Sequence, residues 1–537
     1  MGVGDSIRFR AVVGSLSSGL LLCGLAACGG GGGGGGGPHF SPIGVGSSSG
    51  NSYAAGIFMP SAQFKGSCAA PRPGNADDRQ GTTLDEQLWL RSWSNELYLW
   101  YSEIPDTNPA GYTTATYFDV LKTSAKNSTG TDKDKFHFTL DTAAANAFFQ
   151  AGTTVGYGFE YTAIQSRNIP RDFRVSYIDT NAPPAAIATG IARGAKILKI
   201  DGVDLVNATD LASIATLNAG LSPSASGQQH KFTILDLGAT VSRDVILTSA
   251  VITLTPVKIS TRIGAVGYLM FTDHIATAES ELVSAVQNLQ GVPDLVLDIR
   301  YNGGGYLDIA SELAYMIAGS HTGGHFFEQT QFNNKYTTVD PVTGDALVPT
   351  PFHTQSQGFS VPSGTDLPTL NLPRVFVLTG SGTCSASESV MNGLRGAGVT
   401  VIQIGSTTCG KPYGFHAQDN CGTTYFSIEF KGSNSAGFSD YYDGFVPQNT
   451  ATIPVGTPMQ AILPGCSVAD DFNHALGDPQ EGRLAVALAY TTGGAGACPT
   501  ATGFAPARVK IQSVQGESNV ADAIVVKSPL RENRWLR

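Results

Sequence analysis

Residues 294–317, DLVLDIRYNGGGYLDIASELAYMI, decide the fold of this chain. The first six of them, Asp294 to Ile299, form a nearly continuous apolar run, as in a strand that is buried on both faces. A glycine-rich turn follows, and the run from Tyr306 to Ile317 then has apolar residues at helical spacing. A buried strand followed directly by a helix predicts a mainly parallel sheet covered by helices, with functional residues just past the strand ends.

The same alternation of strands and helices continues on both sides of this stretch. It predicts an α/β core over residues 259–500, in which the polar, turn-rich stretch 333–366 is a surface excursion. The helical run Arg483 to Ala489 is assigned a packing role. The predicted strands are Gly267 to Phe271, Arg374 to Thr379 and Val399 to Ile404, and the predicted helices are Ala276 to Leu289 and Ser385 to Leu394.

Residues 153–258 have a different texture, made of short β-type runs. A glycine-containing loop opens the segment, a strand-like run covers 174–178, and the sequence AKILKIDG covers 195–202. Together these resemble a PDZ domain of bacterial type, in which such a loop offers backbone N–H groups to a peptide's terminal carboxylate. A β-rich insert without that activity is the alternative interpretation. The residues of the predicted peptide-binding loop are Gly156, Tyr157, Gly158 and Phe159.

Residues 67–152 are predicted to form an N-terminal helical cap. The run from Thr83 to Tyr101 carries leucine and tryptophan residues at approximately helical spacing among charged residues. Its aromatic residues suit a packed helix face better than a ligand-binding aromatic cluster.

The N-terminus is predicted to direct export. Arg8 and Arg10 precede a short, uncharged apolar run, and residues 1–27 are therefore interpreted as a signal peptide. The run ends in Leu-Ala-Ala-Cys, which resembles a bacterial lipoprotein processing box and predicts lipidation of Cys28; an ordinary thiol after an ordinary signal peptide is the alternative. Residues 28–66 are expected to be a Gly/Ser-rich tether. The expected location is the bacterial cell envelope, with a lipid anchor in the outer membrane facing the periplasm.

Composition excludes several classes of protein. The 537 residues contain 33 Lys and Arg against 43 Asp and Glu, a net charge of −10 that argues against a nucleic-acid-binding protein. A hydrophobic content of 42% suffices for a buried core and excludes intrinsic disorder. The last 37 residues, 501–537, are interpreted as a C-terminal tail.

Six cysteines remain if Cys23 leaves with the signal peptide and Cys28 is lipidated. An exported protein permits disulfides, and proximity in the chain favours the pairs Cys409 with Cys421 and Cys466 with Cys498, although six cysteines allow fifteen pairings. The chain has no Cys-x-x-Cys and no His-Glu-x-x-His motif, so a metal site is not expected.

Three loops just past predicted strand ends carry the candidate chemistry. In residues 298–305, glycines before a helix free backbone N–H groups for an anion, as in half of an oxyanion hole; a tight turn is the alternative. In residues 380–388, a serine at a strand-to-helix turn presents its hydroxyl while the Ala386 N–H faces a developing oxyanion. Ser385 with Glu388 also has the spacing of a capping box, which is a purely structural interpretation.

The third loop, residues 405–412, contains Lys411. A lysine buried beside a serine can lose its proton and act as a general base, which requires destabilising the charged form by about 4 to 5 kcal/mol. Burial alone supplies that much. An exposed lysine is the ordinary alternative, and a thiol nucleophile formed by Cys384 or Cys409 with His416 is a further one.

The motifs DIRYNGGG (298–305), TCSASE (383–388) and GSTTCGKP (405–412), in this order after a PDZ-like segment, resemble the carboxyl-terminal processing, or tail-specific, serine proteases. The resemblance covers about residues 80 to 450. It implies an α/β, crotonase/ClpP-like core with a parallel sheet, and a PDZ-like β-rich domain that precedes the core or is inserted into it. It assigns Ser385 as nucleophile, Lys411 as general base, and the N–H groups of Gly304 and Ala386 as the oxyanion hole, with Gly303 or Gly305 if the register slips.

The chain departs from the family in one place. Many members have a glutamine four residues after the lysine, where this chain has Phe415. Glu388, His416 and Gln418 are the candidates for an orienting residue. The implied reaction is endoproteolysis of exported proteins or peptides with unstructured C-terminal tails, without a cofactor. The alternative is a non-catalytic lipoprotein of the same fold that binds peptides or small ligands.

Overall fold

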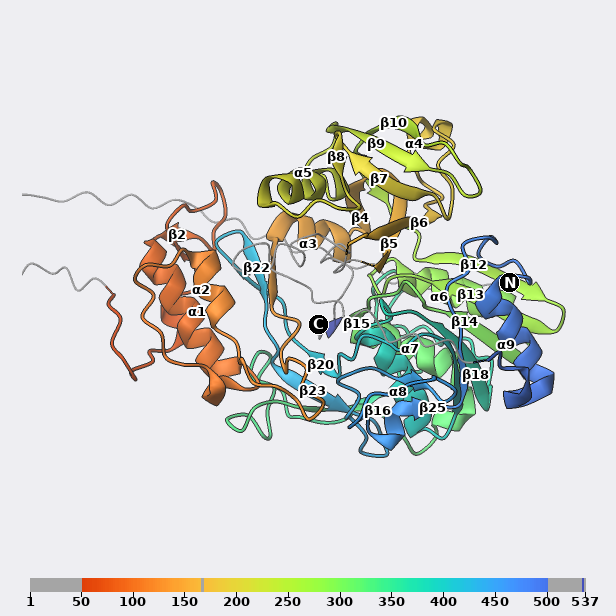
Figure 1. The fold of residues 1–537 in the computed structure, drawn as a ribbon. Coiled ribbons are helices and arrows are strands. Elements are labelled where there is room, and N and C mark those ends of the chain that lie inside the picture. Colours follow the sequence, from red (N-terminus) through yellow and green to blue (C-terminus); the bar gives the residue numbers. More distant parts are fainter. Residues whose placement is uncertain (1–50, 166–168, 501–533, 536–537) are drawn as a thin grey trace, which may run out of the picture. The chain divides into compact units, whose positions relative to one another are not determined.

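The computed structural model describes residues 51–165, 169–500 and 534–535 (Figure 1). The predicted signal peptide, Cys28, the tether as far as residue 50 and most of the predicted tail lie outside these ranges. Within them, no helix has both the length and the apolar character needed to cross a bilayer.

A six-stranded sheet forms the centre of the C-terminal half. Its order is β12-β13-β14-β18-β19-β26, in which β13 to β26 are parallel and β12 pairs with β13 in the antiparallel sense. The predicted mainly parallel sheet is therefore present, with one antiparallel edge strand. The strands are β12 (Val257–Ile263), β13 (Val266–Phe271), β14 (Asp294–Asp298), β18 (Arg374–Thr379), β19 (Thr400–Gly405) and β26 (Gly465–Ser467).

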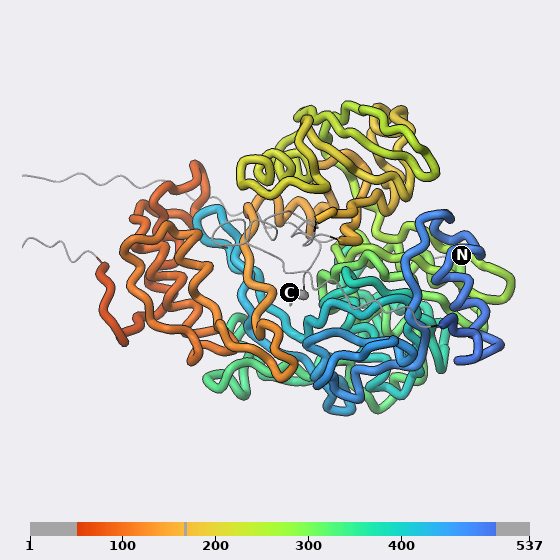
Figure 2. The backbone as a smooth tube through the Cα atoms, viewed as in Figure 1, coloured from red at the N-terminus to blue at the C-terminus, as the bar shows by residue number. Residues whose placement is uncertain are grey.

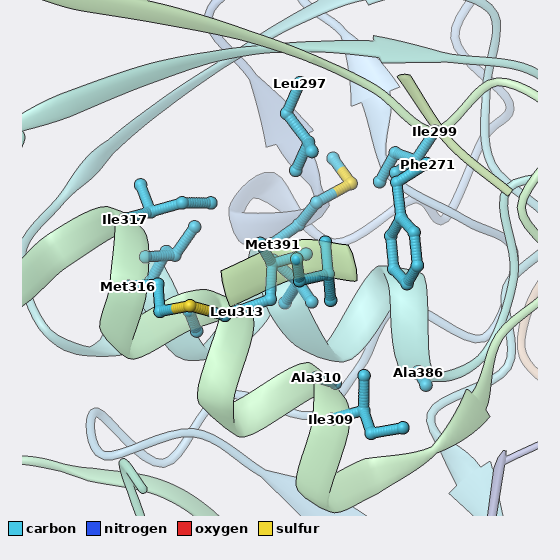
Figure 3. Close-up of a cluster of buried hydrophobic side chains, with 14 of the residues drawn as sticks. Phe271, Leu297, Ile299, Ile309, Ala310, Leu313, Met316, Ile317, Ala386 and Met391 are labelled. Carbon is cyan, nitrogen blue, oxygen red and sulfur yellow. The ribbon is translucent and has the colours of Figure 1, made fainter. Parts of the chain in front are cut away.

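Helices cover both faces of this sheet. Successive residues of a strand point to opposite faces, so neighbouring residues of β14 join different clusters. Leu295 and Leu297 of β14 lie in one buried cluster with residues of α6, α7 and α8, which Figure 3 shows in part. Val296, between them, lies in a second cluster with Leu484 and Ala487 of α9. The helices are α6 (Ala278–Asn288), α7 (Leu307–Ala318), α8 (Ala386–Gly396) and α9 (Gly482–Gly493).

The β-rich segment has a core of its own around Tyr157, Phe173, Leu217 and Phe232. Its antiparallel sheet has the order β10-β9-β7-β6-β5, with β8 paired to β7, so that β5 is an edge strand. The elements are β4 (Thr153–Gly156), β5 (Phe159–Gln165), β6 (Asp172–Ile178), α4 (Pro184–Ala188), β7 (Lys196–Ile200), β8 (Val203–Asp204), α5 (Leu211–Leu221), β9 (Gln229–Leu235), β10 (Arg243–Thr248) and β11 (Ala250–Thr253).

The N-terminal segment contains α1 (Thr83–Leu97), α2 (Thr114–Val120), β3 (Phe138–Asp141) and α3 (Thr142–Phe149). A capping box between Thr82 and Asp85 starts α1. Trp89 and Trp93 stack with ring centroids 5.2 Å apart and pack in a buried cluster, so the aromatic residues of this helix serve packing, as predicted. Strand β3 pairs with β22 (Thr423–Phe426), which lies beside it in Figure 2 although it is far along the chain.

The rest of the C-terminal half consists of loops and short strands, several of which pair in small sheets. The stretch 333–366, predicted to be a surface excursion, is partly anchored: Phe352 and Ser356 are buried, and the Glu279 carboxylate accepts hydrogen bonds from four backbone N–H groups in 357–361. The short strands are β15 (Gly305–Tyr306), β16 (Phe326–Gln331), β17 (Thr350–Pro351), β20 (Tyr413–Gly414), β21 (Gln418–Asn420), β23 (Phe430–Ser433), β24 (Val446–Pro447), β25 (Ile462–Leu463) and β27 (Arg534–Trp535).

Three disulfides join the six cysteines of the described residues. The predicted pair Cys466–Cys498 is confirmed. The predicted pair Cys409–Cys421 is wrong, because Cys421 is bonded to Cys68 across 353 residues and Cys409 is bonded to Cys384. Distance along the chain failed as a guide because the loops after neighbouring parallel strands meet at one sheet edge.

Candidate active site

The three predicted loops meet at the carboxyl ends of β14, β18 and β19. The Asn302 carbonyl in the first loop accepts hydrogen bonds from the Cys384 N–H (3.1 Å) and the Ser387 hydroxyl (3.0 Å) of the second. The Thr383 carbonyl in the second loop accepts one from the Cys409 N–H (3.0 Å) of the third. The structure therefore brings together the loops that sequence reasoning selected separately.

Ser385 has a conformation unusual for a residue with a side chain. It precedes α8 with φ of +61°, a positive value that residues with a side chain seldom adopt. Its side chain is fully buried, and its Oγ has no hydrogen-bond partner among the described residues. The backbone N–H, and not the hydroxyl, bonds to Glu388 (3.1 Å). The Glu388 half of the predicted capping box is thus present, whereas the hydroxyl has no hydrogen-bond partner among the described residues.

Lys411 is also fully buried. Its Nζ lies 4.4 Å from the centre of the Phe415 ring and 5.0 Å from that of Phe136, within the range of cation–π contacts. Phe136 comes from the segment before the β-rich part, so residues far apart in sequence enclose the amine. Phe415, which stands four residues after the lysine, lines the amine with an aromatic face.

The Glu388 carboxylate ties the serine loop to the lysine loop. Its Oε2 accepts hydrogen bonds from the backbone N–H groups of both Ser385 (3.1 Å) and Lys411 (2.8 Å). Its Oε1 accepts from the Gly410 N–H (2.9 Å) and the Thr408 hydroxyl. Burial raises the pKa of Glu388 above its ordinary value, and these four donors oppose that rise by stabilising the ionised form. Glu388 is therefore a positioning group for both backbones.

The predicted oxyanion donors differ in their present partners. Ala386 is the first residue of α8, where a backbone N–H has no acceptor within the helix. The Gly304 N–H donates to Asn302 Oδ1 (2.9 Å) in this structure. The Asn302 side chain in the same tight loop is the acceptor, and the number of glycines in the sequence does not reveal this bond.

Two residues named as candidates for orienting the lysine have other partners. His416 Nδ1 lies 2.8 Å from Glu429 Oε2, and Nε2 lies 3.4 Å from Asp340 Oδ2. Burial lowers the pKa of His416, but the two carboxylates outweigh this effect and raise the pKa to about 9. Gln418 accepts a hydrogen bond from Lys65 (2.9 Å). His416 therefore belongs to a buried ion cluster, and it has no free thiol to pair with because Cys384 and Cys409 form a disulfide.

Sequence reasoning missed His274, which follows β13. Its Nδ1 lies 3.1 Å from Asn302 Oδ1, so the hydrogen-bond network assigns the proton to Nδ1. Its buried Nε2 has no partner among the described residues, and burial lowers the pKa of His274 to about 3. The signal available in the sequence was its place just past a predicted strand.

In the first loop, Arg300 fixes the end of β14. Its buried guanidinium binds the Glu481 carboxylate at 2.7 and 2.9 Å and Asp298 at 2.9 Å. Desolvation lowers the pKa of Arg300, but its carboxylate partners outweigh this and raise it. Glu481 also caps α9, the helix to which a packing role was assigned.

The predicted peptide-binding loop leads straight into the edge strand β5. Tyr157 is buried, and its hydroxyl donates to the Gly220 carbonyl of α5 (2.8 Å). Gly158 has φ of +81°, and a Cβ there would lie 2.5 Å from Ala182, so only glycine fits. Gly156 and Phe159 flank these two residues and end β4 and begin β5.

Comparisons with known proteins match the same part of the chain. Residues 265–417 match the family model of peptidase family S41, and this range holds all three loops. A carboxyl-terminal-processing protease of Picosynechococcus sp. (strain ATCC 27264 / PCC 7002 / PR-6) is 28% identical over 243 residues, which are 42% of this chain and 48% of that protein. The chain thus spans about half the length of the curated relative it matches.

Of two solved structures that resemble the chain, the first shares its fold. A putative S41 protease from Bacteroides fragilis superposes with a TM-score of 0.52 at 22% identity, covering 75% of this chain and 97% of that one. The photosystem II D1 C-terminal processing protease gives a TM-score of 0.39 at 20% identity, covering 70% and 98%. Residues 265–417 thus match a peptidase S41 domain, and the mixed α/β fold is that of the S41 protease structure with the TM-score of 0.52.

Proposed function

We propose that this chain is a serine endopeptidase that uses Ser385 as nucleophile and Lys411 as general base. One observation carries the proposal: a single oxygen of Glu388 accepts hydrogen bonds from the backbones of both residues, and both side chains are buried. A buried hydroxyl without a hydrogen-bond partner and a buried amine in neighbouring loops are the parts of a serine–lysine dyad.

The reaction follows from these groups. Lys411 Nζ accepts the hydroxyl proton as Ser385 Oγ bonds to the scissile carbonyl carbon. The C–N bond then breaks, and the leaving amine takes the proton from the lysine. A water molecule next attacks the acyl ester while Lys411 accepts its proton, and Ser385 Oγ leaves with a proton returned by the lysine.

The oxyanion is proposed to bind at the start of α8. The Ala386 N–H supplies one donor, and the positive end of the helix dipole adds to it. The second donor comes from the glycine loop, where Gly304 must first exchange its bond to Asn302 for one to the substrate. Each such donor is worth about 100- to 1000-fold in kcat.

Cleavage of an unstructured protein with a free apolar C-terminus tests the proposal. Ser385→Ala and Lys411→Met are expected to abolish cleavage by the full chain, whereas Ser381→Ala, in the same loop, is expected to retain it. A serine-reactive fluorophosphonate should label wild type and not Ser385→Ala. Wild type that neither cleaves nor labels, but binds the tail, would establish the non-catalytic binding function instead.

Substrate tails are proposed to bind the β-rich segment. The loop 156–159 opens onto edge strand β5, so a peptide adding to β5 would bring its terminal carboxylate to backbone N–H groups. An amidated tail should then bind at least 10-fold more weakly than a free one. Gly158→Val, which forces a clash with Ala182, should bring the affinity for the free tail down to that for the amidated tail.

An extended substrate is proposed to lie along β15, directly after Gly304. In this structure β27 already pairs with β15 in the parallel sense, Gly305 with Arg534 and Tyr306 with Trp535. An edge that accepts one strand of this chain has the hydrogen-bonding groups to accept a strand of substrate.

Attachment to the outer membrane through lipidated Cys28 remains a proposal from sequence alone, as does the periplasmic location. Cells grown with a radiolabelled fatty acid should yield labelled wild type and unlabelled Cys28→Ser. Recovery of both proteins in the soluble fraction would contradict the anchor.

A further inference from the structure

In the sequence, the Cys384–Cys409 disulfide lies beside the two residues assigned to catalysis. Cys384 immediately precedes Ser385, and Cys409 is two residues before Lys411. The Cα atoms of the cystine are 5.1 Å apart, and 25 residues separate the two positions in the chain. One covalent bond therefore joins the nucleophile loop directly to the loop of the general base.

The backbone around this cystine belongs to all three loops of the site. The Cys384 N–H donates to the Asn302 carbonyl of the glycine loop (3.1 Å), and the Cys409 N–H donates to the Thr383 carbonyl (3.0 Å). Ser385 must at the same time keep its unusual φ of +61°. A cross-link next to such a residue limits the alternative conformations that the loop would otherwise sample.

The Glu388 carboxylate is sensitive to the state of the cystine. Cys409 Sγ lies 3.5 Å from Glu388 Oε2, the oxygen that also accepts from the Ser385 and Lys411 backbones. A cystine sulfur has no proton to donate. After reduction, the thiol of Cys409 becomes a donor within reach of that oxygen and competes with the two backbone N–H groups.

We propose that the Cys384–Cys409 disulfide is a positioning element that holds the serine and the lysine in catalytic register, so that its reduction switches the peptidase off while the fold persists. This inference rests on the proposed function. Reduction adds two electrons and two protons to the cystine and gives two thiols, and an added dithiol supplies them as it becomes a cyclic disulfide. Cys384 is buried and Cys409 is partly exposed, which gives the dithiol one sulfur to attack.

The other two disulfides are built-in controls. Cys68–Cys421 joins an N-terminal strand to the β21–β22 turn, and Cys466–Cys498 joins β26 to the segment after α9. Neither is adjacent in sequence to the serine or the lysine. Their removal is expected to lower thermal stability without changing the geometry of the three loops.

The test compares full-length double variants in which one disulfide at a time is replaced by alanines. Cys384→Ala with Cys409→Ala is expected to lower kcat about 100-fold with KM within about 2-fold, because an error of about 1 Å in catalytic geometry costs that much. Its rate of labelling by a fluorophosphonate should fall in parallel. Cys68→Ala with Cys421→Ala, and Cys466→Ala with Cys498→Ala, should keep both kcat and the labelling rate.

A redox cycle separates positioning from folding. A variant in which alanines replace both other disulfides keeps only the site disulfide. Dithiol should lower its kcat without altering its circular dichroism, and reoxidation should restore the kcat. If that variant does not fold, wild type is reduced stepwise, and mass spectrometry identifies which cystine opens as activity falls.

Each outcome decides the matter. An active wild type with an equally active Cys384→Ala, Cys409→Ala variant overturns the inference and leaves the proposed function intact. Loss of kcat without recovery on reoxidation, or loss that tracks the opening of another cystine, also overturns it. Wild type that neither cleaves nor labels at Ser385 overturns both.

Discussion

Replacing Glu388 with glutamine tests whether one buried carboxylate holds the catalytic loops together. Oε1 faces two donors, the Thr408 hydroxyl and the Gly410 N–H, and Oε2 faces the N–H groups of Ser385 and Lys411. A glutamine of the same shape has one oxygen and one NH2 group, and the NH2 group only donates hydrogen bonds. It would therefore face two groups that also donate. Its better place is opposite Thr408, whose hydroxyl can turn and accept, which leaves the Gly410 N–H without an acceptor.

The magnitude follows from these bonds. An unsatisfied buried N–H costs about 1 to 3 kcal/mol, and exchanging charge-assisted for neutral bonds at Ser385 and Lys411 costs about 1 kcal/mol each. The smaller desolvation cost of an amide offsets part of this. A net loss of about 3 kcal/mol lowers Tm by roughly 6 to 12 °C for a unit of 150 to 250 residues. Since both catalytic backbones move, we expect kcat to fall about 100-fold.

The assay combines thermal melting at pH 7 with cleavage of an unstructured substrate. Asp345→Asn, an exposed change that also removes one negative charge, is the control and should melt within about 2 °C of wild type. A Glu388→Gln protein that melts as close to wild type as this control and cleaves at the same rate would refute the reasoning.

Three further predictions concern stability, the glycine loop and the strand on β15. Burial, and secondly a neighbouring carboxylate, raise the pKa of Glu312 to about 9, so its contribution to stability is full below about pH 4.5 and is lost as the pH rises toward 9. Tm should therefore fall more steeply over this pH range in wild type than in Glu312→Gln. Equal slopes in the two proteins would contradict the prediction. Gly305 has φ of +141°, and a Cβ would lie 2.1 Å from the His274 carbonyl oxygen, so Gly305→Ala should lower both Tm and kcat. The control Gly324→Ala also changes a glycine with positive φ, but no atom lies near its Cβ position, so it should lower Tm less and leave kcat unchanged. Equal effects of the two substitutions would count against the clash. Deleting residues 534–537 frees the edge of β15 and should raise kcat/KM severalfold, whereas an unchanged kcat/KM would show that β27 does not compete with substrate.

Much of the fold could be predicted from local pattern. Burial on both faces makes β14 apolar along its length, and the structure places that strand inside the sheet as the pattern predicts. The helix predicted for Tyr306 to Ile317 is α7, Leu307–Ala318, with the same apolar face. These features depend on neighbours within about ten residues, which is why a single sequence contains them.

The site was only partly predictable. The sequence located three loops past strand ends, and the parallel order of β14, β18 and β19 brings them to one edge. It did not show that the Gly304 N–H is taken by Asn302, that His274 lies beside the same loop, or that His416 pairs with Glu429. Each of these depends on which acceptor lies nearest in space.

By itself, the sequence determined the alternation of strands and helices, the glycines and serine of the loops, and the lysine two residues from a cysteine. Only the tertiary structure decided that Cys384 bonds to Cys409, that Cys421 bonds to Cys68, and that Phe136 covers the lysine. The physical reason is one of range. Periodicity and turn chemistry act between near neighbours in the chain, whereas disulfides, buried ion pairs and ring contacts join whichever groups the packed sheet brings within a few ångströms.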